Sequence, residues 1–151
     1  MKGSKQVVKQ VFHIAVPAEY FFHRVIELVL YDIYQQTGKK IKPQELKGFS
    51  FKRKNSTGFI SKMTIIDYQP NKIYAYLNHT RYNRYKVVYQ IEPIGNQRMR
   101  LLYRETIKGY GGFNKDYNIF KPITVFLRKR YFKKIKKQLE ADYIQQESHK
   151  S

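Results

Sequence analysis

The sequence predicts an α+β fold in which a curved, six-stranded antiparallel sheet is wrapped around a long C-terminal helix. Three observations predict it. The period of the apolar residues changes along the chain in the order strand, helix, five strands, helix. The five central runs are joined by short turn sequences, so neighbouring strands should be antiparallel. The last long stretch is an amphipathic helix, which can cover a sheet that has one apolar face.

The N-terminal segment is predicted to be a strand followed by a helix. Apolar residues alternate loosely over Lys5–Val16, which is typical of a strand. A helix is expected from Ala18 to about Gln36, with Gly38 as its C-terminal stop. This helix is apolar over most of its circumference, so it should be wedged into the body of the protein. Pro43–Leu46 is expected to add one short helical turn.

Five strand-like runs fill the middle of the chain, separated by residues that favour turns. The alternation is clear in the fourth run, where Val87, Tyr89 and Ile91 share one face and Lys86 and Gln90 share the other. Such runs form a sheet with one apolar face, which has to be covered. The predicted strands are Phe49–Lys54, Phe59–Tyr68, Ile73–Thr80, Tyr85–Glu92 and Arg98–Lys108.

The cover is predicted to be the closing helix, from Phe120 to about Gln146, with Pro122 at its start. A helix of about 25 residues is about 38 Å long, which is enough to cross a small sheet. Its apolar side comprises Val125, Leu127, Tyr131, Phe132, Ile135, Leu139 and Tyr143. Its basic residues fall mostly on the other side, and they are Lys129, Arg130, Lys133, Lys134, Lys136 and Lys137.

Composition sets broad limits on the class of protein. With 151 residues and 42% hydrophobic content, the chain is expected to form one folded domain over residues 1–151. The absence of cysteine removes disulfides, thiolate metal sites and cysteine catalysis, and it suits a reducing cytoplasm. No signal peptide or membrane span is predicted, because no apolar run approaches about 18 residues.

The chain is strongly basic, with a net charge of +19 from 30 Lys and Arg against 11 Asp and Glu. This balance favours contact with nucleic acid, acidic lipid head groups or an anionic ligand. It is also a common compositional background. The charge therefore assigns no partner by itself.

Two segments carry a resemblance to a known superfamily: the strand-to-helix junction Ile14–Phe22 (IAVPAEYFF) and the ending Phe126–Ile135 (FLRKRYFKKI). Together with the order of elements, they resemble the START/SRPBCC superfamily, which has the helix-grip fold. Within it, the chain looks like a family of small uncharacterised proteins from low-GC Gram-positive bacteria. The resemblance implies a cavity for an apolar or amphipathic ligand between the sheet and the last helix. It implies no reaction, because some members of the superfamily are cyclisation enzymes and others only bind.

Glu105 is the acidic residue of most interest, because it shares the strand parity of the apolar residues and should point inward. An inward carboxylate needs a partner, and the candidates are His79, Arg81 and the hydroxyls of Tyr89 and Tyr103. Structural pairing, orientation of a ligand and acid–base chemistry all stay open for it. The candidate ligand-binding residues are Tyr76, His79, Arg81, Tyr89, Tyr103, Glu105, Tyr110, Phe113, Leu127 and Tyr131.

A glycine-rich loop follows the last strand, with Gly109, Gly111 and Gly112. It is interpreted as a flexible lid in which Tyr110 and Phe113 can cover a bound apolar group, and a plain loop is the alternative. The histidines have no defensible metal-ligand spacing, and no catalytic triad order occurs. No metal site, catalytic residue or cofactor is predicted.

The first functional hypothesis is a small cytoplasmic protein that binds a hydrophobic or amphipathic small molecule in the cavity between the sheet and the C-terminal helix. The second is a basic-surface binder of nucleic acid or acidic membrane, acting through the outer face of the closing helix. The third is an enzyme of cyclase or hydrolase type that uses the same cavity. The sequence favours the first hypothesis, and the ligand's identity stays open.

Overall fold

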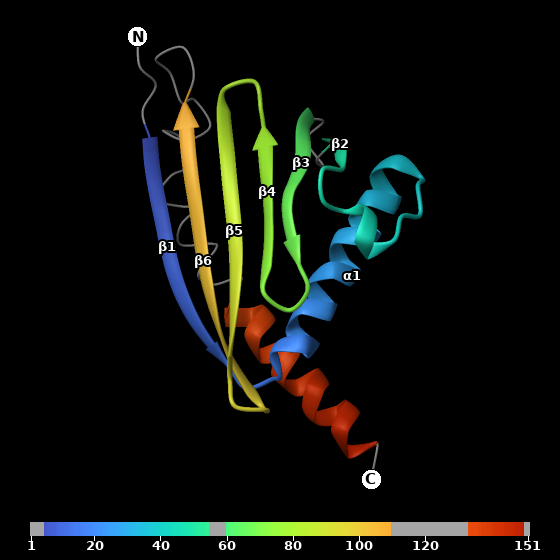
Figure 1. The fold of residues 1–151 in the computed structure, drawn as a ribbon, viewed down its shortest axis with the longest axis vertical. Helices are drawn as coiled ribbons and strands as arrows, with labels where there is room; N and C mark the ends of the chain where they lie inside the picture. The colour runs from blue at the N-terminus through green and yellow to red at the C-terminus, as the bar shows by residue number, and fades with distance from the viewer. Residues whose placement is uncertain (1–4, 55–59, 110–132, 150–151) are drawn as a thin grey trace.

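The computed structural model describes residues 5–54, 60–109 and 133–149. It confirms the predicted α+β class, with one six-stranded antiparallel sheet in the order β1-β6-β5-β4-β3-β2 (Figure 1). A helix over residues 133–148, here called the C-terminal helix, closes the described chain. The other elements are β1 (Lys5–Ile14), α1 (Ala18–Thr37), the 3-10 turn η1 (Pro43–Glu45), β2 (Ser50–Lys54), β3 (Ile60–Gln69), β4 (Ile73–His79), β5 (Asn83–Ile94) and β6 (Arg98–Gly109).

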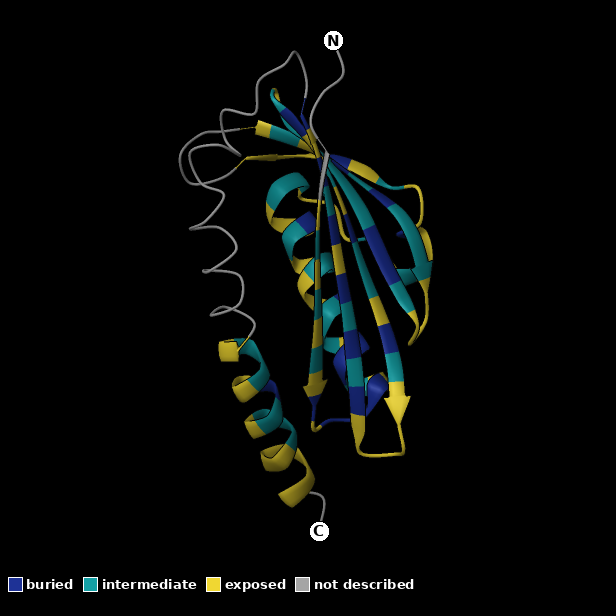
Figure 2. Cartoon of the chain, turned by 90° about the vertical axis from the view of Figure 1, so that its left-hand side faces the viewer, coloured by how far each residue is buried: buried dark blue, intermediate teal, exposed yellow. Residues whose placement is uncertain are grey.

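The sheet has one face packed against the helices, called the inner face, and one open face, called the outer face. Burial alternates along the strands, as Figure 2 shows. On β6 the predicted inward residues Met99, Leu101 and Tyr103 are buried, whereas Arg104 and Lys108 are exposed. Because opposite residues of paired strands point to the same side, this parity carries across the sheet. The predicted one-sided sheet is confirmed.

Helix α1 lies on the inner face and ends as predicted at Gly38, whose left-handed backbone (φ 74°) closes the helix. Phe21, Phe22 and Ile33 are buried in the core. The prediction that the helix is wedged into the body is wrong for its outward side, where Tyr31 is 63% exposed. A helix that is apolar on most sides therefore leaves apolar surface open to solvent here.

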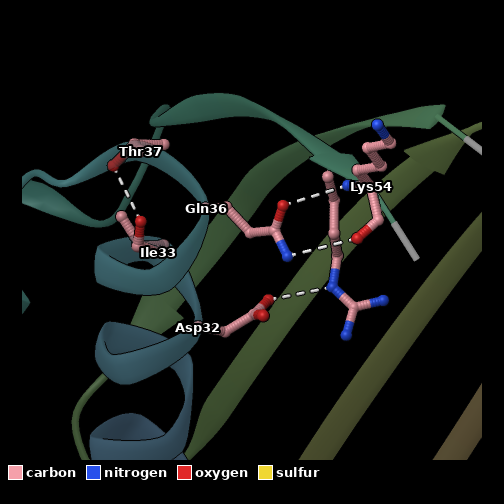
Figure 3. A network of polar contacts seen from close by, with 6 residues as sticks. Asp32, Ile33, Gln36, Thr37 and Lys54 are labelled. Atoms are coloured by element: carbon pink, nitrogen blue, oxygen red, sulfur yellow. Dashed lines mark hydrogen bonds and ion pairs between the residues drawn. The ribbon is translucent and has the colours of Figure 1, made fainter. Parts of the chain in front are cut away.

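The C-terminal end of α1 is hydrogen-bonded to the edge strand β2. The side-chain amide of Gln36 pairs with the backbone of Lys54, accepting from its N–H at 3.0 Å and donating to its carbonyl at 3.3 Å (Figure 3). One turn earlier, Asp32 accepts a hydrogen bond from Nε of Arg53 at 3.0 Å. These contacts fix the distance between α1 and the sheet edge.

The C-terminal helix lies on the same side of the sheet as α1 (Figures 1 and 2). The part of the prediction that begins at Phe120 falls outside the described residues. Within them, Leu139 is buried and Ile135 and Tyr143 pack partly buried against the core, as the apolar stripe predicts. The described helices include none that is long and apolar enough to cross a bilayer.

Candidate functional site

A pocket of about 520 Å³ lies between the inner face of the sheet, α1 and the C-terminal helix. Helix α1 contributes an apolar wall with Phe21, Val25 and Val29. The C-terminal helix contributes Ile135 and Leu139. This volume is that of a small-molecule site, for which clefts of about 300–1,000 Å³ are usual.

The sheet side of the pocket is lined by aromatic rings. Tyr74 and Tyr76 of β4 have ring centroids 5.8 Å apart, and Tyr74 meets Tyr89 of β5 at 5.9 Å in an edge-to-face contact. The ring of Tyr89 in turn meets Tyr103 of β6 at 5.4 Å. These contacts follow from the register, in which Tyr74, Tyr89 and Tyr103 lie opposite one another on adjacent strands. The pleat therefore builds a continuous aromatic row across the inner face.

Tyr74 keeps its phenol proton under all ordinary conditions. Burial raises its pKa well above the usual range, and the neighbouring Tyr76 and the carboxylate of Asp32 raise the pKa further. A neutral phenol can donate a hydrogen bond and also accept one. The sheet wall therefore offers neutral hydroxyl groups on an otherwise apolar surface.

Two polar atoms in the pocket wall are buried and lack a hydrogen-bond partner among the described residues. They are Nε of Arg24, on α1, and Oδ1 of Asn78, on β4. The side chain of Arg24 is 41% exposed as a whole, and within the described part of the chain its guanidinium forms one long ion pair, with Nη1 3.7 Å from Oε2 of Glu27. A buried donor and a buried acceptor left unpaired each cost about 1–3 kcal/mol. The pocket wall thus presents one unmet positive donor and one unmet acceptor.

The rim of the pocket is polar. Asp32 and Arg53, which form the ion pair between α1 and β2, both line it. The C-terminal helix adds Gln138 and Asp142, whose side chains are hydrogen-bonded at 2.8 Å, and also Lys136. Lys136 was predicted on the solvent side of the helix with the other lysines, so its place at the pocket differs from that prediction. An apolar interior with a charged rim suits a molecule that has both characters.

The ten predicted ligand-binding residues do not all reach this pocket. Tyr76 and Tyr89 line it. Tyr103 and Glu105 lie on the same face beside it, and the hydroxyl of Tyr103 donates to Oε2 of Glu105 at 2.9 Å. Glu105 points inward as predicted and is only 1% exposed. Its predicted part in ligand binding stays a prediction. Four other predicted residues, Tyr110, Phe113, Leu127 and Tyr131, lie outside the described residues.

His79 and Arg81 lie away from the pocket. His79 is on the outer face, where it stands opposite Lys62 of β3 and Arg84 of β5. Burial lowers the pKa of His79, and the nearby charges of Arg84 and Lys62 lower it further. Arg81 is exposed in the turn between β4 and β5, with its guanidinium 5.6 Å from the ring centroid of Tyr82.

Sequence reasoning missed the part that α1 plays in the site. The available signal was Arg24, a single cation inside the apolar run of that helix, and Asn78, a single amide at the end of an apolar strand. Each is a polar residue where the pattern calls for an apolar one, which often marks a functional position. Among the described residues no group of three or more metal-ligating side chains occurs.

Comparisons with known proteins support the fold. Residues 6–128 match a family described as "domain of unknown function (DUF3284)". A comparison with curated proteins found no match.

Solved structures share the architecture. Protein MLL2253 from Mesorhizobium loti has a TM-score of 0.61 at 17% identity, over 90% of this chain and 98% of that one. Norcoclaurine synthase from Thalictrum flavum has a TM-score of 0.64 at 9% identity, over 94% and 90%. Ara h 8.0201 has a TM-score of 0.62 at 11% identity, over 94% and 99%. These similarities show the predicted helix-grip fold of the START/SRPBCC type. The predicted link to low-GC Gram-positive bacteria stays a prediction.

Proposed function

The chain belongs to the DUF3284 family, and we propose that it binds a hydrophobic or amphipathic small molecule in the pocket between the sheet, α1 and the C-terminal helix. The observation that carries the proposal is the pocket itself, about 520 Å³ with a largely apolar and aromatic wall. Affinity comes mainly from removing apolar surface of the ligand from water, at about 25 cal/mol per Å². The predicted cavity beneath the C-terminal helix is thereby extended to include α1.

The ligand is proposed to be amphipathic because the wall has polar atoms to satisfy. An acceptor group of the ligand, favoured if anionic, pairs with Nε of Arg24. A donor group pairs with Oδ1 of Asn78. Tyr74 adds a neutral hydroxyl near Asp32. A purely apolar ligand leaves Nε of Arg24 and Oδ1 of Asn78 without partners. A ligand that carries both an acceptor and a donor group is therefore preferred.

A neighbour of the same fold gives a precedent. The norcoclaurine synthase structure was determined in complex with dopamine and hydroxybenzaldehyde, which are small molecules with an aromatic ring and polar substituents. Because the two chains are only 9% identical, this neighbour supports the idea that the fold can hold a small molecule. It points to no particular ligand for this chain. Protein purified from its own host and measured by native mass spectrometry is expected to carry a small molecule.

The binding site is tested with a pocket-filling variant. Val25 lines the pocket, so Val25→Trp should fill it and reduce binding of the fluorescent probe 8-anilino-1-naphthalenesulfonate at least tenfold. The matched control is Val11→Trp, because Val11 is on the outer face of β1 and is 54% exposed. Equal probe binding by Val25→Trp and wild type, with both folded by circular dichroism, would contradict the proposal.

The proposed setting is the cytoplasm, and the proposed unit is a single START/SRPBCC-like domain over residues 1–151. A chain without cysteine suits a reducing compartment. The six strands form one sheet, and residues from all of them pack with α1 and the C-terminal helix in one hydrophobic core. A single cooperative unfolding transition, identical by circular dichroism and tyrosine fluorescence, is the expected result for one domain.

A further inference from the structure

The outer face of the sheet carries a line of basic residues that crosses five neighbouring strands, from β2 to β6. The residues stand directly opposite one another in the strand register, one per strand, so their side chains point to the same side. Adjacent strands are about 4.8 Å apart, so the line is about 19 Å long. These five residues, Lys52, Lys62, His79, Arg84 and Lys108, form the basic row.

The four Lys and Arg residues of this row are open to solvent, and none of them stands opposite an acidic residue in the register of the described strands. Lys52, Lys62, Arg84 and Lys108 are all exposed, and none of them forms an ion pair with a carboxylate of the described residues. A second group of exposed cations lies next to the row on the same face, two to four residues farther along the strands. It consists of Lys9, Lys86 and Arg104.

The acidic residues of the outer face lie farther along the strands and are already paired. Asp67 is 3.8 Å from Nζ of Lys47, and Glu92 is bound by Arg100. Glu92 is eight residues beyond Arg84 on β5, a distance of about 27 Å. The basic row therefore keeps its positive charge. Burial lowers the pKa of His79, and the neighbouring charges of Arg84 and Lys62 lower this pKa further.

We propose that the basic row binds the phosphate backbone of a nucleic-acid duplex without reading its sequence. A line of cations matches a line of phosphates, and neutralising the row removes the repulsion among its members. The outer face of the described strands carries no Phe, Tyr or Trp side chain on which single-stranded bases can stack, so a duplex is favoured over a single strand. The surface lies on the opposite side of the sheet from the pocket, so this inference is independent of the proposed ligand.

An acidic membrane is the other polyanion to consider, and the geometry favours it less. The sheet curves around the helices along the direction of the row (Figure 2). A flat bilayer therefore contacts fewer of these cations at once than the phosphate backbone of a duplex, which can follow the row. The same lack of aromatic side chains removes the anchors that membrane-surface proteins place at the interface.

The test measures binding to a fluorescein-labelled 20-base-pair DNA duplex by anisotropy, between 50 and 200 mM KCl. With about four phosphates neutralised, the affinity of the wild type should fall roughly 100-fold over this range, since each contact contributes about 0.9 to the salt slope. The variant Lys62→Glu with Arg84→Glu should bind at least tenfold more weakly at 50 mM KCl. Its salt slope should be smaller by about two.

The matched control is Lys133→Glu with Lys137→Glu, which makes the same change in net charge on exposed residues of the C-terminal helix. It should change duplex affinity less than threefold. An equal loss in both double variants would overturn the basic row as the site. Absence of duplex binding by the wild type at 50 mM KCl would also overturn it, as would row-dependent binding only to phosphatidylserine-containing vesicles.

Discussion

The backbone N–H of Ala15 donates a hydrogen bond to Oε2 of Glu140 at 2.7 Å, joining two residues that are 125 positions apart in the chain. Ala15 lies in the junction between β1 and α1, and Glu140 lies on the C-terminal helix. Close by, the rings of Tyr20 and Tyr143 meet edge to face, with centroids 5.1 Å apart. The C-terminal helix is therefore attached where the other two elements of the pocket meet.

Glu140→Ala should loosen this attachment. The junction N–H loses its acceptor, and a hydrogen bond of this kind contributes about 1 kcal/mol to the free energy of unfolding. Urea unfolding should report a loss of that size, whereas Lys134→Ala, an exposed residue on the same helix, should be close to neutral. Identical stability of the two variants would show that the helix is held without this contact.

Leu139→Ala should have a larger effect, because Leu139 is the buried apolar residue of the described part of the helix and also lines the pocket. Removing a buried leucine side chain costs about 2–4 kcal/mol, through lost burial and the cavity left behind. Ile144→Ala is the control on the same helix, since Ile144 is 67% exposed. Thermal denaturation should separate the two variants clearly. Equal melting temperatures would mean that the helix does not contribute to the core.

Tyr103→Phe should destabilise the protein by removing a donor to the buried carboxyl of Glu105. A polar group that loses a partner in the interior costs about 1–3 kcal/mol. Tyr31→Phe is the control, because Tyr31 is 63% exposed on α1. If chemical denaturation shows no difference between the two variants, Glu105 is held by its other contacts and Tyr103 serves for packing alone.

The strand parity was predictable wherever polar and apolar residues alternate. On β6, Arg104 and Lys108 stand between buried positions, so the inward direction of Glu105 could be inferred from the sequence. A period of two places alternate side chains on opposite faces, and this needs only local information. The existence of Glu105 as a buried acid was therefore predictable, together with its neighbour Tyr103.

The parity of β4 could not be predicted in the same way. Its first five residues, Ile73–Leu77, are all apolar, so alternation does not separate the two faces. His79 was consequently a candidate partner for Glu105, although the register places it on the outer face beside Lys62. The basic row was hidden for a related reason. It exists only through the register of five strands, and pairing between distant segments is not encoded in any one run of sequence.

His79 should make the stability of the protein depend on pH. Burial, followed by Arg84 and Lys62, lowers its pKa, so the folded state binds this proton more weakly than the unfolded state. Its contribution to stability is therefore complete above the ordinary histidine value of about 6.5 and is lost as pH falls from there towards the folded pKa. Nuclear magnetic resonance titration of the imidazole should show the lowered value.

The same titration connects His79 to the basic row. Lys62→Gln should raise the pKa of His79 by removing one neighbouring charge, whereas Lys133→Gln on the C-terminal helix should leave it unchanged. A bound duplex should also raise this pKa, because phosphates beside the row favour the protonated imidazole, and duplex affinity should then increase as pH is lowered through the titration. A pKa of His79 that stays the same with and without the duplex would place the nucleic acid elsewhere on the protein.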